Sequence, residues 1–145
     1  MEIYYFSYTG TSKKIAEILA KKLKVKLKEI KTFKFPYFIW LFLSFFPYFP
    51  IKSQFEPLSS DTIILCFPKW TFNCPPVTYF LRKIKCQKIY MIISYKGWGE
   101  KKYIEYYKKL GSKSAKEIKI FIIKRKNFLA NSIKIIDYIL QNIEN

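Results

Sequence analysis

Apolar and polar residues follow two different periods along the chain, one typical of strands and the other of helices. Short apolar runs predict strands at 3–6, 62–67, 89–93 and 118–123. A further strand is predicted at 25–28, where apolar residues alternate with lysines as they do near a sheet edge. The runs at 62–67 and 89–93 are continuously apolar, and the run at 118–123 looks alike apart from Lys119. This pattern indicates strands that are covered on both faces.

Between these runs, apolar residues recur at helical spacing. Pro75 and Pro76 can open one helix, and Gly111 can close another. The predicted helices are 13–23, 75–84, 100–110 and 128–143. Strands that alternate with helices predict an α/β fold, a three-layer, doubly wound, five-stranded parallel sheet with helices on both faces.

The chain shows no internal repeat and no low-complexity linker, so we expect one domain over 1–145 with an apolar insert at about 33–57. The segment from Phe35 to Ile51 contains no charged residue, and its three prolines limit any helix to a length that cannot cross a bilayer. Three roles stay open for it: an insert buried over the sheet, a homodimer or partner surface, or a membrane-surface contact.

The formal net charge is +17, from 27 Lys and Arg against 10 Asp and Glu. Such a charge favours nucleic acid, anionic lipid or an acidic protein as partner. The lysines are scattered over nearly every segment, which is equally typical of the lysine-rich composition of thermophile proteins.

Metal and histidine chemistry have no support in the sequence. The chain has no histidine, and Cys66, Cys74 and Cys86 form no CxxC pair, so we expect no metal site and no histidine-dependent catalytic residue. Three unpaired thiols and the absence of a signal-peptide pattern predict a cytoplasmic protein, in which the apolar segment could still give peripheral membrane contact.

The richest candidate site is the loop after the first strand, because ligands of doubly wound sheets bind beyond the carboxyl ends of the strands. Here hydroxyl side chains surround Gly10 at the start of a helix, where backbone N–H groups stabilise an anion. The hydroxyl residues are Ser7, Thr9, Thr11 and Ser12. Neither GxxxxGK[ST] nor GxGxxG is present, so the pattern predicts the phosphate monoester of a mononucleotide.

Residues 5–12, YFSYTGTS, followed by Ala16 and Leu19 on the helix, resemble the phosphate loop of flavodoxins. The resemblance implies the strand order 2-1-3-4-5 and FMN as cofactor. It also implies that the loop residues bind the FMN phosphate: Ser7, Thr9, Gly10, Thr11 and Ser12.

Two later loops resemble the ring-binding segments of short flavodoxin-like proteins. In the loop after the third strand, the resemblance implies that Trp70 stacks on the flavin ring. In the loop after the fourth, the residue facing the ring stays open between Tyr95 and Trp98. The implied cofactor-binding residues of these loops are Pro68, Lys69, Trp70, Thr71, Tyr95, Gly97, Trp98 and Gly99.

We therefore expect a flavodoxin-like FMN-binding protein that acts in electron transfer, with a redox partner protein of acidic character, or as a small flavin-dependent reductase. No side chain stands out as an acid or base, which favours a carrier over an enzyme. The alternative is a basic, aromatic-rich module that binds an anionic membrane surface or nucleic acid and keeps the fold without flavin. Nucleic acid is the less favoured partner, because no RNA-binding signature is present.

Overall fold

The computed structural model describes residues 1–46, 48–70 and 72–143. Its centre is a five-stranded parallel sheet, whose spatial order β2-β1-β5-β6-β7 is the order 2-1-3-4-5. The strands are β1 (Glu2–Tyr5), β2 (Lys26–Glu29), β5 (Thr62–Pro68), β6 (Cys86–Tyr95) and β7 (Ala115–Lys124). The predicted fold class is confirmed.

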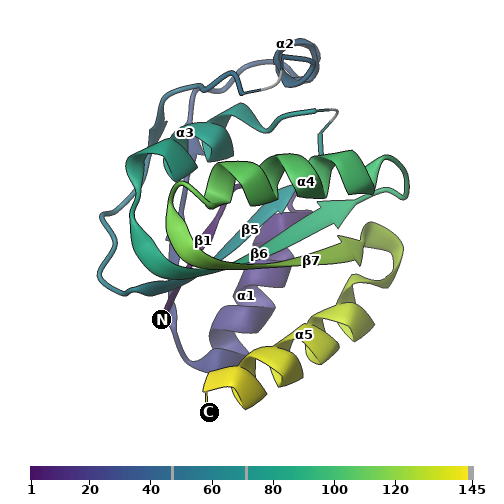
Figure 1. Cartoon of the computed structure of the whole chain (residues 1–145). Coiled ribbons are helices and arrows are strands. Elements are labelled where there is room, and N and C mark those ends of the chain that lie inside the picture. Colours follow the sequence, from purple (N-terminus) through teal and green to yellow (C-terminus); the bar gives the residue numbers. More distant parts are fainter. Residues whose placement is uncertain (47, 71, 144–145) are drawn as a thin grey trace.

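Helices cover both faces of the sheet and give three layers (Figure 1). The helices α1 (Thr11–Leu23) and α5 (Phe128–Ile143) pack on one face, and α3 (Pro75–Lys83) and α4 (Glu100–Gly111) on the other. Because successive strand residues point to opposite faces, Ile3 contributes to the α1–α5 core and Tyr4 to the α3–α4 core.

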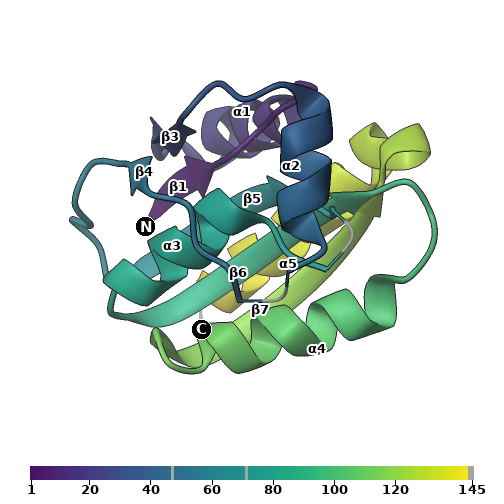
Figure 2. The same cartoon turned by 90° about the horizontal axis from the view of Figure 1, so that it is seen from above.

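The connection from β2 to β5 holds the insert. It contains the antiparallel pair β3 (Lys31–Thr32) and β4 (Ser53–Gln54), with α2 (Tyr37–Ser44) between them. Figure 1 shows α2 beyond α3 and α4, at the top of the molecule, and Figure 2 shows it from above, lying over the rest of the ribbon.

The two faces of α2 have different surroundings. Trp40 and Ser44 are buried, and the Trp40 ring lies 5.6 Å from the ring of Trp70. Phe38 and Phe42 are 70% and 63% exposed. Burial within the domain therefore accounts for only the inner face of this helix.

Candidate functional site

The carboxyl ends of β1, β5 and β6 lie side by side, because Tyr5 pairs with Cys66 and Cys66 with Ile92. Strand order reverses here, which is where doubly wound sheets bind their ligands. A cavity of about 550 Å³ opens at this edge, within the range of small-molecule sites. Its walls are formed by Tyr8, Thr9, Tyr37, Leu41, Pro68, Lys69, Trp70, Lys96, Trp98 and Arg125.

The loop after β1 turns directly into α1. Gly10, the residue that precedes the helix, has a φ of 97°, which glycine adopts without strain. Its N–H donates to the hydroxyl of Ser7 at 3.0 Å, and its carbonyl accepts from the N–H of Lys14 at 3.0 Å. No side chain caps the first turn of α1, so its backbone N–H groups point out of the helix end as anion donors.

The four hydroxyls of this loop have different environments. Ser7 accepts the bond from Gly10, whereas Ser12 is buried and shares a hydrogen bond of 3.1 Å with the hydroxyl of Ser94 at the end of β6. The hydroxyls of Thr9 and Thr11 make no hydrogen bond with another described residue. Ser7 keeps its O–H free to donate, so Ser7, Thr9 and Thr11 are the hydroxyls left to receive a ligand, and Ser12 joins the helix to the sheet.

Trp70 forms a wall of the cavity rather than an open platform. Its ring packs edge-on against Phe6 at 5.6 Å and against Tyr8 at 6.4 Å, and only 8% of the residue is exposed. The hydroxyl of Tyr103, on α4, donates to the carbonyl of Pro68 at 3.1 Å. This bond fixes the chain just before Trp70. The predicted site residue Thr71 lies outside the described residues.

The loop after β6 places Trp98 at the cavity. This ring is 69% exposed, and the ammonium of Lys69 lies 4.5 Å from its centre. Tyr95 does not line the cavity, so between the two aromatic residues left open above, the geometry favours Trp98. Gly99 has a φ of 70°, which glycine adopts without strain. A Cβ at this position would lie 3.4 Å from the ammonium of Lys69, so the glycine also leaves room for that side chain.

The cavity is cationic. Lys69, Lys96 and Arg125 line it, and none of its described lining residues is a carboxylate. Burial lowers the pKa of Lys69, and the negative charge of Glu100 acts in the opposite direction. An anion in this cavity would therefore find positive charge on several sides.

Arg125 lies in the turn η1 (Arg125–Asn127), directly after β7. Its Nε atom is buried without a hydrogen-bond partner among the described residues. A buried donor without a partner costs stability, which points to an acceptor supplied from outside the chain. Arg125 is not among the site residues predicted from the sequence, although Lys124, Arg125 and Lys126 form a basic run at the carboxyl end of the last strand.

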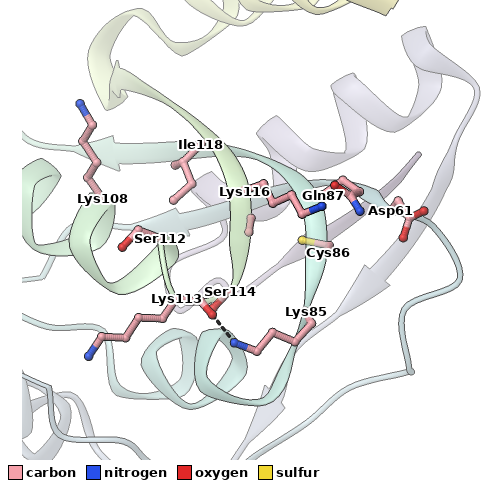
Figure 3. A pocket seen from close by; sticks show the side chains of 11 residues that line it. Asp61, Lys85, Cys86, Gln87, Lys108, Ser112, Lys113, Ser114, Lys116 and Ile118 are labelled. Carbon is pink, nitrogen blue, oxygen red and sulfur yellow. Dashed lines mark hydrogen bonds between the residues drawn. The ribbon is translucent and has the colours of Figure 1, made fainter.

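A larger hollow of about 660 Å³ lies at the amino ends of β6 and β7, beside Asp61 and Cys86 (Figure 3). Lys85, Lys108, Lys113 and Lys116 are among the residues that line it, and Lys85 donates to the carbonyl of Lys113. Burial raises the pKa of the Cys86 thiol to about 11, so this sulfur is a poor nucleophile. No group of metal-binding side chains occurs among the described residues.

The strand order and the loop at the switch point define a flavodoxin-like fold. The chain resembles the crystal structure of a flavoprotein in complex with FMN from Lactobacillus acidophilus NCFM, with a TM-score of 0.67 at 17% identity, covering 84% of this chain and 89% of that one. It also resembles an NAD(P)H:quinone oxidoreductase from Methanothermobacter marburgensis, with a TM-score of 0.58 at 12% identity over 100% and 98% of the two chains. At sequence identities this low, the structural similarity shows only that these chains share a fold.

No protein-family model matches the chain. An uncharacterized protein of Archaeoglobus fulgidus is 48% identical over 141 residues, which cover 96% of this chain and 95% of that protein. The chain belongs to the same family as this archaeal protein.

Proposed function

We propose that the protein binds FMN in the cavity at the carboxyl ends of the strands and acts as an electron carrier. The observation that carries this proposal is the uncapped start of α1, with the hydroxyls of Thr9 and Thr11, directly beside a cation-lined cavity. An FMN phosphate is an anion that these donors suit. The likeness to a flavoprotein crystallised with FMN supports the same assignment.

The residues at the cavity fit FMN by the chemistry of their donors. Thr9, Thr11 and the first N–H groups of α1 would hold the phosphate, and the unpartnered Nε of Arg125 offers a further donor to an anionic or carbonyl oxygen. Tyr8, Trp70 and Trp98 would supply the aromatic surroundings of the flavin ring. The site residues predicted from the sequence remain predictions, of which the titration with FMN tests Thr9 and Thr11.

Bound FMN would supply the redox chemistry, accepting and delivering electrons. Lys69 and Lys96 would stabilise negative charge that develops on a reduced ring, which makes the ring easier to reduce. No described residue lining the cavity is a carboxylate or a histidine that could act as a general acid or base at neutral pH. This favours a carrier over a reductase with catalytic side chains of its own.

The test is a titration of the flavin-free protein with FMN, followed by flavin fluorescence. We expect saturable quenching by the parent protein, and binding weakened at least about tenfold in Thr9→Ala/Thr11→Ala, which loses two hydrogen bonds to a charged group. The control Thr9→Ser/Thr11→Ser keeps both hydroxyls and should bind within about threefold of the parent. A parent protein that does not bind FMN, or an alanine variant that binds as well as the parent, would contradict the proposal.

A further inference from the structure

The outer face of α2 and the two residues that follow it carry exposed aromatic and aliphatic side chains. We call this face the α2 surface and define it as Tyr37, Phe38, Leu41, Phe42, Phe45 and Phe46. Their spacing of one, three and four residues places them on one side of a helix.

The domain makes no use of this surface for its own core. The inner face of α2 already contacts the core through Trp40 and Ser44, and each residue of the α2 surface is at least 40% exposed. Phe45 lies 6.0 Å from Phe72, which is itself 45% exposed, so the apolar area continues onto the loop after β5. A contiguous apolar area of this kind on a folded domain marks an interaction site.

The surroundings of the α2 surface are basic. Neither residues 30–55 nor residues 62–99 contain an aspartate or glutamate, and these two stretches supply α2 and the loop that carries Phe72. Lys34 and Lys52 are exposed and flank α2 in the sequence, Lys34 before the helix and Lys52 after it. Lys69 and Lys102 lie in a hollow that they share with Phe72.

We propose that the α2 surface docks onto an anionic lipid bilayer, with its phenylalanines at the boundary of the acyl chains and the surrounding lysines at the headgroups. Apolar residues inside a cationic rim are the combination that binds such a bilayer. A second copy of the chain fits less well, because it would bring another +17 charges against the same basic rim.

The geometry of the fold suits a peripheral contact. The α2 helix lies on the outside of the molecule, beyond the layer of α3 and α4 (Figure 1). Within the part of the chain that the structure describes, no helix is long and apolar enough to cross a membrane. Tyr37 and Leu41 also line the cavity, so docking would bring the cavity mouth close to the bilayer.

The test is co-sedimentation of the full chain with vesicles of equal parts phosphatidylcholine and phosphatidylglycerol. The variant Phe38→Ser/Phe42→Ser removes two highly exposed rings, and we expect it to bind these vesicles at least about tenfold more weakly than the parent. The matched control is Leu129→Ser/Ile133→Ser, which changes two residues of the same spacing on α5, 59% and 57% exposed. This control should bind within about twofold of the parent.

Circular dichroism and thermal unfolding establish that all variants fold. Equal binding by the parent and by Phe38→Ser/Phe42→Ser would overturn the proposal, since net charge alone would then hold the protein on the vesicles. A parent protein that does not bind the vesicles would also overturn the proposal. If, in addition, the parent is a dimer that these two substitutions dissociate, the α2 surface is a dimer interface instead. None of these outcomes depends on whether FMN binds.

Discussion

The guanidinium of Arg125 carries a buried Nε that no described residue hydrogen-bonds, in a cavity wall. If an oxygen of FMN accepts from this side chain, Arg125→Met should weaken FMN binding about tenfold, because a charge-assisted hydrogen bond is lost while the apolar stem is kept. Calorimetric titration of the flavin-free protein measures the affinity, and thermal unfolding measures stability.

The matched control for this prediction is Lys126→Met, which removes an exposed positive charge from the neighbouring position. We expect it to change the affinity less than about twofold. The thermal stability of Arg125→Met should not fall, because the Nε atom has no partner to lose in the described part of the chain. An unchanged affinity for FMN in Arg125→Met would show that the Arg125 side chain does not hydrogen-bond FMN.

A buried ion pair joins the edge strand β2 to its neighbour β1. Lys28 Nζ lies 2.8 Å from Glu2 Oε2, and both side chains are at most 3% exposed. The N–H and the hydroxyl of Ser59 also donate to Glu2, at 2.9 and 2.7 Å. Burial acts to raise the pKa of Glu2, but the bonds from Lys28 and Ser59 outweigh it and lower this pKa to about 2.

A carboxyl group whose pKa is lowered in the folded state stabilises that state above its ordinary pKa, and the stabilisation is lost as the pH falls toward 2. Glu2→Gln should therefore lower the free energy of unfolding by about 3 kcal/mol at neutral pH, because Lys28 loses the carboxylate that is buried with it and keeps only the exposed carboxylate of Glu56, 3.8 Å away. The difference from the parent should shrink between roughly pH 5 and pH 2. Urea unfolding at a series of pH values measures it.

The control for this edge is Glu29→Gln, because Glu29 lies on β2 next to Lys28, is exposed and has no ion pair among the described residues. Its effect should stay within about 0.5 kcal/mol at every pH. A Glu2→Gln penalty that is the same at pH 3 and pH 7 would show that the lost packing, and not the charge, sets the stability of this edge.

The charge of the whole molecule is poorly balanced. Of its 27 lysines and arginines, only Lys26, Lys28 and Lys88 form ion pairs with described carboxylates. The remaining positive charges repel one another, and this repulsion destabilises the compact state.

Added salt should therefore raise the melting temperature of the protein. The Debye length falls from about 30 Å at 0.01 M to about 8 Å at 0.15 M, so most of the repulsion between exposed lysines is screened over this range. Thermal unfolding in sodium chloride and in sodium acetate at equal ionic strength measures the effect and separates screening from binding of one anion. A melting temperature that falls as either salt is added would contradict the expectation.

The sequence by itself determined the types of the main elements and the fold class. A strand covered on both faces must be continuously apolar and a helix on a sheet must have an apolar stripe, so β5, β6 and the helices α1, α3, α4 and α5 could be recognised from local pattern, whereas α2 was not predicted. The first residues of β6 and β7 could not be predicted from the pattern. These strands begin at Cys86 and Ala115, a few residues before their apolar runs, because polar residues can pair in a ladder as well as apolar ones. The two-residue strands β3 and β4 were too short to show a period.

Only the tertiary structure decided how the candidate site is divided among its residues. Ser12 and Ser94 are 82 positions apart, so no local pattern could reveal that their hydroxyls bond to each other and that Ser12 is thereby engaged with the sheet. In the same way, folding buries Trp70, exposes Trp98 and brings Arg125 to the cavity from the end of the edge strand β7. The physical reason is that periodicity reports which side of an element is apolar, whereas the composition of a site depends on contacts between elements that the chain joins only in space.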